Sequence, residues 1–537
     1  MTRRIRLHLV AVALGLLVLA PSAAARHGSA DDASANMVHV ANLPQPAAFA
    51  TCDRGSSSCF NSDLAFWRAG GTKGGHHDLL AQGNYEGFRL VDISDPANPQ
   101  NIAVVECRAN QGDLSFYKAN NRLLLIQSIE EPVTTPECAT AVETGFAAGT
   151  HPILGTPGLF RVPGFEGLRI FDVSDPTAPQ LVAAVPTACG SHTHTTISDR
   201  RNQRAIVYVS SYPTGARLTP RERLGFGGPT CVPPHRKISI VEIPDANPEG
   251  ARVLKEQPLD ADTLPFRGSF AQGGTGAVGC HDITVLAETG SRATAGAACL
   301  EEGQLWDVSD PANPTTLTSH THIRNRYISG PGTALGLFHT ASFSWDGKVL
   351  LFTDEWAGGG AHACDGPQDL RGNVWFYENV PPGTAVAPLF GRFILPRPQP
   401  AEDVCSMHNG NVVPTAAGYL GVSSAYEGGT SVFDFSSVTS FPRILDPLPG
   451  EPGDPVPPTV ATEKAFYDAK ADGKGVDDAW SSYWHNDYIY ASSGLQRPGQ
   501  RGLDVYMLLD EKGKQFGARD FRYTNPQTQE VFQGVGR

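Results

Sequence analysis

Five histidines in this 537-residue chain each stand in a short segment with the apolar pattern of a β-strand. These residues are His194 (HTHTTIS), His281 (GCHDITV), His339 (LFHTASF), His408 (SMHNGNVV) and His485 (YWHNDYIY). Asp63 in NSDLAF and Asp113 in QGDLSF occupy the matching place in two earlier segments. Neutral imidazole with carboxylate suits a transition metal such as Cu, Zn or Mn rather than Ca²⁺. The chemistry that these residue types allow is therefore metal binding, with a carboxylate as proton acceptor.

The elements that would position these residues come from a repeated phrase, Gly-x-x-apolar-x-Asp-apolar. The clearest copies are GFRLVDISDPANP at Gly87, GLRIFDVSDPTAP at Gly167 and GQLWDVSDPANP at Gly303, and weaker copies begin at Lys237, Gly372, Gly429 and Gly502. Gly and the Asp-Pro or Asn-Pro turns mark strand limits, and further apolar runs precede and follow each clear copy. Four short antiparallel strands per unit, repeated about seven times, predict an all-β, seven-bladed β-propeller.

These phrases resemble the third-strand sequence of the LVIVD-repeat proteins, a family of secreted or surface seven-bladed propellers. The resemblance covers roughly residues 41–510. It implies the fold and no single activity, because the family is defined by its architecture. The first strand, MVHVANLP at Met37, lacks an inner partner. We therefore expect this N-terminal strand to complete the last blade and close the ring.

In a propeller the first strand of each blade lines the central channel, which would bring the five histidines and two aspartates to one mouth. A lone histidine at such a place is more often a hydrogen-bonded structural residue than a ligand. Five converging imidazoles would repel one another as cations and would leave unsatisfied nitrogens if neutral, so an ion or bound waters should satisfy them. Three interpretations stay open: a transition-metal site held by some three or four histidines, a water-filled structural channel, and an anion site of protonated histidines.

Loops that return to the same mouth carry further acidic residues. The second strand of a blade runs antiparallel to the first, so its far end lies beside the start of the first. Glu355 and Glu427 stand at such ends. Together with Asp63 and Asp113 they are the candidate catalytic carboxylates.

Ten cysteines, an even number, predict disulfides in an exported chain. Neighbouring couples give five expected pairs: Cys52–Cys59, Cys107–Cys138, Cys189–Cys231, Cys280–Cys299 and Cys364–Cys405. Three of the pairs join a long loop to a segment just before an innermost strand, which would fix these loops over the channel mouth. Stabilisation of long loops without any role in binding is an equally good explanation.

Residues 1–25 have the basic start, short apolar core and small-residue end of a secretory signal peptide. No later segment approaches the roughly 20 apolar residues of a membrane-spanning helix, so we expect a secreted protein without a membrane anchor. The predicted propeller occupies residues 36–510, with an inserted loop at 446–478 and a peripheral C-terminal extension at 511–537. A net charge of −13 without a Lys/Arg cluster argues against nucleic acid as a partner.

Two functions from different classes fit these observations. The first is a secreted metal-dependent enzyme, of oxidoreductase or lyase type, that acts on a small molecule or an extracellular polymer at the channel mouth. The second is a non-catalytic extracellular or cell-surface interaction module that binds through disulfide-pinned loops on one face.

Overall fold

The computed structural model describes residues 32–49, 60–68, 78–133, 138, 165–212, 235–259, 279–289, 292–300, 302–316, 323–324, 336–356, 358–359, 362–380, 387–401, 403–416, 418–445, 456–469, 479–493 and 502–530. The predicted signal peptide and the predicted pair Cys52–Cys59 lie outside these residues. Short 3-10 turns occur at η1 (Ala47–Phe49), η3 (Arg200–Asn202), η5 (Pro248–Gly250) and η6 (Val438–Ser440). Within the described ranges, no helix has the length and apolar character needed to cross a membrane.

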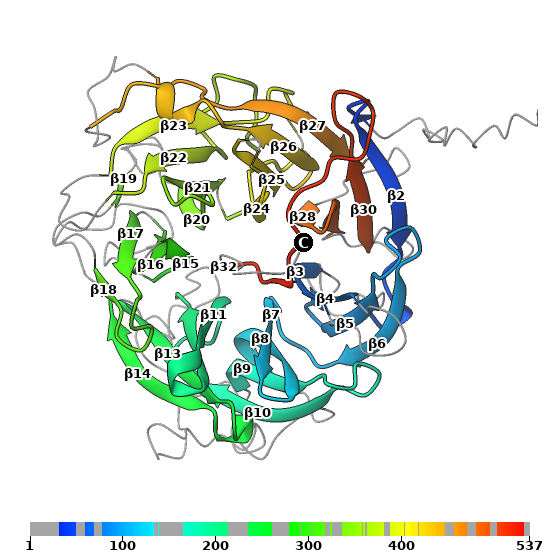
Figure 1. Ribbon diagram of the computed structural model, residues 1–537, viewed down its shortest axis with the longest axis vertical. Coiled ribbons are helices and arrows are strands. Elements are labelled where there is room, and N and C mark those ends of the chain that lie inside the picture. Colours follow the sequence, from blue (N-terminus) through cyan, green and yellow to red (C-terminus); the bar gives the residue numbers. More distant parts are fainter. Residues whose placement is uncertain are drawn as a thin grey trace, which may run out of the picture.

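Seven antiparallel sheets stand around a central channel as the blades of a β-propeller (Figure 1). Blade one contains β3 (Asn61–Arg68), β4 (Asp78–Asn84), β5 (Gly87–Asp92) and β6 (Gln100–Glu106). Blade two contains β7 (Leu114–Ala119), β8 (Arg122–Val133), β9 (Phe165–Asp172) and β10 (Gln180–Pro186). Blade three contains β11 (Thr193–Asp199), β12 (Arg204–Ser210), β13 (Lys237–Pro244) and β14 (Arg252–Pro258). Blade four contains β15 (Asp282–Thr289), β16 (Arg292–Cys299), β17 (Glu302–Asp307) and β18 (Thr315–Thr316), with β19 (Ile323–Arg324) beside β17. Blade five contains β20 (Gly336–Phe343), β21 (Val349–Trp356), β22 (Val374–Glu378) and β23 (Leu389–Phe393). Blade six is β24 (Gly410–Val412), β25 (Leu420–Ser424), β26 (Thr430–Asp434) and β27 (Thr462–Asp468), with β1 (Asp32–Ala33) outside it, and blade seven contains β28 (Ala479–His485), β29 (Tyr488–Ser493) and β30 (Leu503–Leu508). The predicted all-β, seven-bladed propeller is confirmed.

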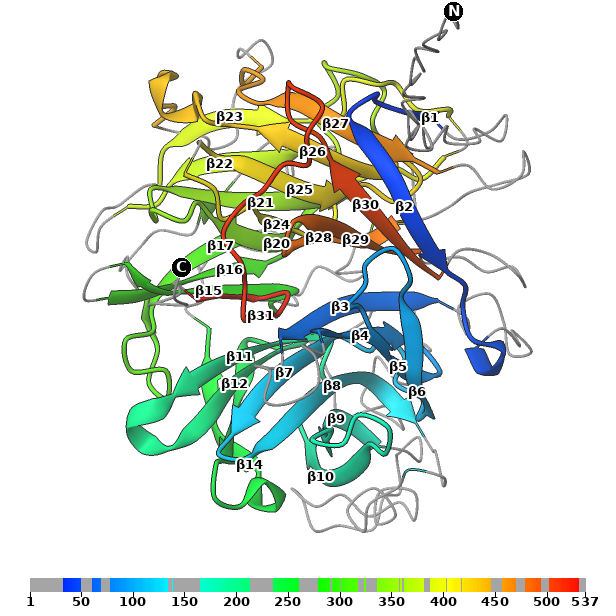
Figure 2. The same ribbon diagram turned by 45° about the vertical axis from the view of Figure 1, so that its right-hand side comes forward.

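The ring closes through its N-terminal strand. β2 (Met37–Leu43) pairs antiparallel with β30, with Met37 opposite Leu508 and Leu43 opposite Leu503. Figure 2 shows β2 lying along the outer edge of β30. This closure confirms the expected role of the segment at Met37.

The repeated Asp-apolar-Ser phrase makes the turn that leads out of the third strand of a blade. Asp92 Oδ1 accepts the backbone N–H of Ser94 at 2.9 Å. Equivalent bonds join Asp172 to Ser174 at 2.9 Å and Asp307 to Ser309 at 2.9 Å. An aspartate that bonds the backbone two residues ahead stabilises a turn locally. The phrase is therefore scaffold, and the functional residues have to be sought on the innermost strands.

The predicted insertion at residues 446–478 is wrong in part. β27 lies inside that range and pairs with β26 as the outer strand of blade six. Its sequence, TEKAFYD, is exposed at Thr462 and Lys464 and buried at Tyr467 and Asp468, so it lacks the continuous apolar run of a fully buried strand. A proline-rich segment precedes it, and the strand pattern is correspondingly weak in the sequence.

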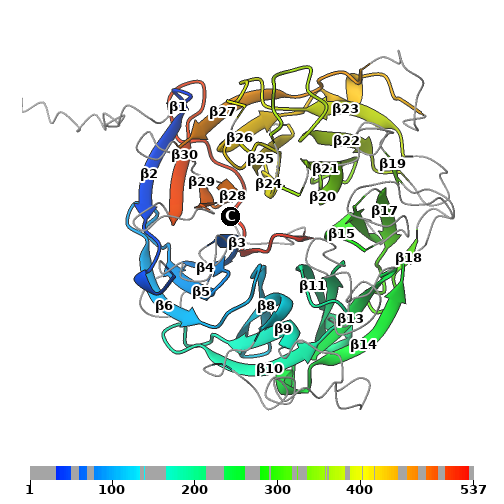
Figure 3. The same cartoon turned by 180° about the vertical axis from the view of Figure 1, so that it is seen from behind.

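The C-terminal segment 521–530 crosses the channel and does not lie at the periphery as expected (Figure 3). β31 (Tyr523–Thr524) pairs with β3, and β32 (Thr528–Glu530) pairs in parallel with β15. The Gln529 amide bonds the backbone N–H and carbonyl of Phe343, at 2.6 and 2.9 Å. The tail meets these innermost strands toward their C-terminal ends, so it spans the mouth opposite their first residues.

Asn525 offers a test of this tail contact. Its side chain accepts the N–H of Phe116 at 2.8 Å and donates to the Phe116 carbonyl at 2.9 Å. Asn525→Ala removes both partners, and since a buried polar group left unpaired costs about 1–3 kcal/mol, we expect the free energy of unfolding to fall by about 2–4 kcal/mol in urea. Gln515→Ala, at an exposed tail position, is the matched control and should leave the urea midpoint unchanged. Equal midpoints for the two variants would contradict a docked tail.

Candidate metal centre

Four imidazoles form an arc across blades three to six, at the start of the innermost strands. They belong to His192, His281, His339 and His408, and the ring centroids of successive pairs are 4.1, 3.8 and 4.1 Å apart. All four side chains are buried. The structure thus brings together three of the five predicted ligand histidines and adds His192.

Glu355 is the carboxylate that joins this arc, from the end of β21. Its Oε2 lies 3.9 Å from Nε2 of His339, and its Oε1 lies 3.8 Å from Nε2 of His408. The hydroxyl of Tyr426 donates a hydrogen bond of 2.5 Å to Oε1. Burial raises the pKa of Glu355 to about 7, although the Tyr426 hydrogen bond and His192 act in the opposite direction. Glu355 is the one predicted catalytic carboxylate that meets the histidines directly.

His281, His339 and Glu355 form the tightest donor set. Each offers one ligand atom, and these atoms all lie within 4.8 Å of one another. Burial, and then the neighbouring histidines, hold the pKa values of His281 and His339 well below their usual range, and burial lowers that of His408 to about 3. The imidazoles are therefore neutral, which is the form that binds a metal. Nδ1 of His281 is buried without a hydrogen-bond partner, so two imidazoles and a carboxylate with one unsatisfied nitrogen fit a transition metal ion.

Protein acceptors hold the outer nitrogens of the flanking imidazoles. Glu130 Oε1 lies 2.8 Å from Nδ1 of His192, and the carbonyl oxygen of Trp480 lies 2.5 Å from Nδ1 of His408. A proton on Nδ1 leaves the lone pair of Nε2 facing the arc. Partners of this kind fix the ring orientation and tautomer of metal-binding histidines.

A directed chain of hydrogen bonds fixes the tautomer of His339. Asn409 Nδ2 donates to Asp63 Oδ2 at 3.0 Å, which turns Asn409 Oδ1 toward Thr340. Thr340 Oγ1 donates to this oxygen at 2.9 Å and lies 2.7 Å from Nδ1 of His339. Because the hydroxyl proton of Thr340 is already donated to Asn409, its oxygen accepts a hydrogen bond from Nδ1–H of His339, and Nε2 is left free to bind a metal. Asp63 thus acts on the centre through Asn409 and Thr340.

Thr340→Val tests this chain, since it keeps the side-chain shape and removes the hydroxyl. We expect the affinity for the transition metal to fall by about 10–100-fold, the usual effect of losing an outer partner of a metal ligand. Competition with a chromophoric chelator measures the affinity. Thr340→Ser keeps the hydroxyl and should bind like the wild type, so equal losses in the Val and Ser variants would rule out the proposed tautomer control.

His194, which the sequence predicts as a ligand, does not belong to the arc. His192, which the sequence analysis did not predict, takes its place. Nε2 of His194 lies 2.7 Å from Ser115 Oγ and Nδ1 lies 2.8 Å from Ser128 Oγ, so both nitrogens are engaged in joining blade three to blade two. Residues two apart on a strand share a face, and the strand pattern alone does not choose between the two histidines. The Cys-x-x-His spacing at Cys189, repeated at Cys405 before His408, would have selected His192.

His485 was placed at the wrong end of its strand. It ends β28, where Nδ1 lies 2.8 Å from Thr524 Oγ1 of the tail and the ring stacks on Phe66 with centroids 4.5 Å apart. The strand precedes this histidine, whereas it follows the other channel histidines. Trp480 is the blade-seven residue that adjoins the arc, with its ring centroid 5.2 Å from that of His408.

Comparison with known proteins supports the scaffold. Residues 80–105 and 164–187 match the LVIVD repeat family, over β4–β6 of blade one and β9–β10 of blade two. These two segments are similar to the LVIVD repeat. No curated protein matches this chain.

Solved structures similar to this chain include a putative 6-phosphogluconolactonase from Bacteroides fragilis, at 9% identity over 87% of this chain and 97% of that one, with a TM-score of 0.44. A protein from Lactobacillus plantarum is 10% identical over 86% and 95% of the two chains, with a TM-score of 0.43. The β-propeller domain of Cps50 (Swd1) from Myceliophteria thermophila is 10% identical over 84% and 98%, with a TM-score of 0.39. Similarities this distant give no ground for transferring a function.

Two other predicted catalytic carboxylates, Asp113 and Glu427, lie outside the arc of histidines. Asp113 Oδ2 accepts the backbone N–H of His194 at 2.7 Å. The Glu427 carboxylate accepts the N–H of Val404 in a neighbouring loop, and burial raises the pKa of Glu427 to about 7. Neither belongs to the donor set of His281, His339 and Glu355.

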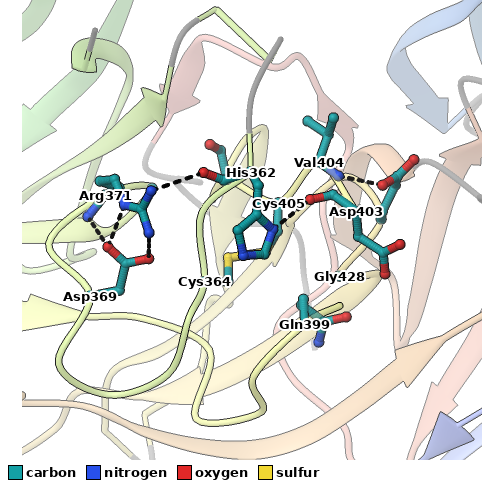
Figure 4. Close-up of a disulfide and its surroundings, with 12 residues drawn as sticks. His362, Cys364, Asp369, Arg371, Gln399, Asp403, Val404, Cys405 and Gly428 are labelled. Carbon is teal, nitrogen blue, oxygen red and sulfur yellow. Dashed lines mark hydrogen bonds and ion pairs between the residues drawn. A yellow bond between two sulfur atoms is a disulfide. The ribbon is translucent and has the colours of Figure 1, made fainter. Parts of the chain in front are cut away.

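Three of the predicted disulfides are present in the described residues. Cys107–Cys138, Cys280–Cys299 and Cys364–Cys405 are formed. Cys189 is also disulfide-bonded, and its predicted partner Cys231 lies outside the described residues. Near Cys364–Cys405, Nδ1 of His362 bonds the carbonyl of Asp403 at 2.7 Å (Figure 4). This bridge holds the loop after β21 against the segment that leads into His408.

Proposed function

We propose that His281, His339 and Glu355 bind one transition metal ion and that the protein is a metal-dependent enzyme acting at the channel mouth. The observation that carries the proposal is the convergence of these three buried ligand atoms within 4.8 Å. The imidazoles of His281 and His339 are neutral, and Thr340 holds Nδ1 of His339 as the outer partner of a metal-binding histidine does. His192 and His408 flank the set and are candidates for a fourth ligand.

If neither His192 nor His408 closes the set, three protein ligands would leave a coordination position open, as in catalytic rather than structural transition-metal sites. A bound ion would supply Lewis-acid or redox chemistry. Tyr426 would hold Glu355 in place through its hydrogen bond to Oε1. Since the tail spans the other mouth, a small molecule or the end of an extracellular polymer would approach from the side of the arc.

Export from the cytoplasm is part of this proposal. Disulfides persist in oxidising compartments, and each cysteine of the described residues is bonded. The acidic chain, at net charge −13, is not suited to an anionic partner such as nucleic acid.

Metal analysis of protein purified without a chelator or a His tag tests the proposal. We expect about one equivalent of a single transition metal, bound by deprotonated ligands. Less than about a tenth of an equivalent, with no thermal stabilisation on adding Cu, Zn or Mn, would refute it and favour a non-catalytic interaction module.

A further inference from the structure

A second group of acidic residues lies in the channel, distinct from the arc of histidines. Asp63, Asp113 and Asp282 come from the innermost-strand segments of blades one, two and four and are at most 2% exposed. Asp113 Oδ2 accepts the backbone N–H of His194 at 2.7 Å, and the hydroxyl of the preceding residue, Thr193, donates to Asp282 Oδ1 at 3.3 Å. The buried phenol of Tyr483 hydrogen-bonds Asp63; burial raises its pKa well above the usual value, and Asp63, Asp113 and Asp282 raise it further. Three buried carboxylates therefore share one region of the channel.

Among the described residues, no Lys or Arg side chain balances the charge of this group. His194 Nδ1 lies 3.2 Å from Asp113 Oδ2, and no Lys or Arg in this part of the chain forms an ion pair with the three aspartates. Charges buried in a protein interior are normally paired or bound to a metal ion. The described residues therefore provide no Lys or Arg as a counter-charge for the three carboxylates.

An independent observation comes from the C-terminal tail. Gln527, 1% exposed, hydrogen-bonds the Asp282 carboxylate, and its own Oε1 is buried without a partner. Oδ1 of Asp113 and Oγ1 of Thr284, two residues beyond Asp282 on the same strand face, are also buried without partners. Buried polar atoms are normally satisfied, so these three oxygens indicate an absent bonding partner.

We propose that Asp63, Asp113, Asp282 and the Gln527 amide oxygen hold a hydrated divalent cation, Ca²⁺ or Mg²⁺, which fastens the C-terminal tail to the channel. Every donor in this group is an oxygen, and oxygen donors select these hard cations over the transition metals of the histidine arc. Among the described residues only His281, His339 and Glu355 bring three ligand atoms within 4.8 Å, so the aspartates are spaced more widely. The cation accordingly keeps part of its water, as Mg²⁺ does readily and Ca²⁺ in part.

Calorimetric titration of the metal-stripped, full-length protein with CaCl₂ and, separately, MgCl₂ tests the proposal. One cation binds, and the melting temperature rises by several degrees because the cation binds only the folded state. The tighter of the two titrations identifies the cation. Asp113→Asn weakens binding by about tenfold or more, because affinity at such sites follows the number of charged ligands.

Gln527→Ala separates the site from any general effect of charge. It removes an uncharged tail ligand, weakens cation binding, and abolishes the protection of the tail from hydrogen exchange that the cation otherwise confers. Gln515→Ala, also in the tail but exposed, keeps wild-type binding and protection. Should Asp113→Asn fail to fold, Gln527→Ala and Thr284→Val carry the test.

The outcomes distinguish this site from the transition-metal centre. His339→Ala loses the transition metal and keeps the Ca²⁺ or Mg²⁺ response, whereas Asp113→Asn and Gln527→Ala do the reverse. Absence of binding up to about 10 mM of either cation, well above the weakest extracellular calcium sites, overturns the inference. So does binding that is unchanged in both Asp113→Asn and Gln527→Ala.

Discussion

Replacing His339 with alanine should reduce the transition metal content of the purified protein from about one equivalent to less than about a tenth. His339 is the middle residue of the arc, with its ring centroid 3.8 Å from that of His281 and 4.1 Å from that of His408. Its removal leaves one imidazole and one carboxylate of the converging set, so the loss should exceed the roughly 100-fold effect of an outer partner. Elemental analysis and competition with a chelator measure the two quantities.

Glu355→Gln should give a comparable loss, because it removes the carboxylate charge and keeps the shape of the side chain. His362→Ala is the matched control: His362 also has a hydrogen-bonded imidazole, but it lies in the loop beside Cys364–Cys405 and outside the arc. This variant should retain the full metal content. Retention of metal in His339→Ala and Glu355→Gln together would mean that the converging atoms are not the ligands.

The fold, and the equivalent positions of His281, His339 and His408, could be predicted from the sequence for a physical reason. The repeat sets strand limits and the turn after the third strand, and these recur in every clear copy, as in the bond from Asp92 to Ser94. Once the blades are counted, the innermost strands follow. His281, His339 and His408 then occupy equivalent positions, and they do meet in the structure.

The sequence alone does not predict which residue along a single strand reaches the arc of histidines. His192 and His194 share a strand face, and only packing against the next blades shows that His192 reaches His281 while His194 bonds Ser115. The prediction for His485 was wrong for a related reason. Apolar residues stand on both sides of it in the sequence, and β28 precedes it. A two-residue or six-residue displacement along a strand changes little in the apolar pattern and moves a side chain from one mouth toward the other.

The tail and the chain of bonds behind His339 were also hidden, because both depend on contacts between distant segments. Asn525 bonds Phe116 across 409 residues of sequence, and Asn409 bonds Asp63 across 346. Neither polar residue lies in a motif that would single it out. Sequence patterns report local structure, whereas these contacts arise only when the ring has closed.

The wild type should lose stability as the pH rises from 7 to 9 in the presence of a chelator, and Asp63→Asn should remove the part of this loss that is due to Asp63. The variant keeps the part due to Asp354, because burial also raises the pKa of Asp354 to about 8. Burial, and then Asp113, raise the pKa of Asp63 to about 8 in the folded protein, against 3.8 ordinarily. The folded state therefore holds a proton that the unfolded state releases, and the associated stability, complete below about pH 4, is lost as the pH rises through 8. Buried histidines do not confuse this range, because an unfolded histidine is already neutral above about pH 7.

Urea unfolding at pH 7, 8 and 9 measures the effect. Since one pH unit of displaced titration is worth about 1.4 kcal/mol, the wild type should lose about 1–2 kcal/mol across this range through Asp63, and the amide variant should lack that contribution. Glu511→Gln, at an exposed position near the C-terminus, is the control and should follow the wild type. If the free energy of unfolding of Asp63→Asn instead fell with pH as steeply as that of the wild type, Asp63 would have to be ionised over the whole range. Asn409, which orients Thr340 and His339, would then donate its hydrogen bond to an ionised carboxylate at every pH.

The same measurement with saturating Ca²⁺ or Mg²⁺ should make the free energy of unfolding of the wild type less dependent on pH, because a bound cation favours the ionised form of the carboxylates around it.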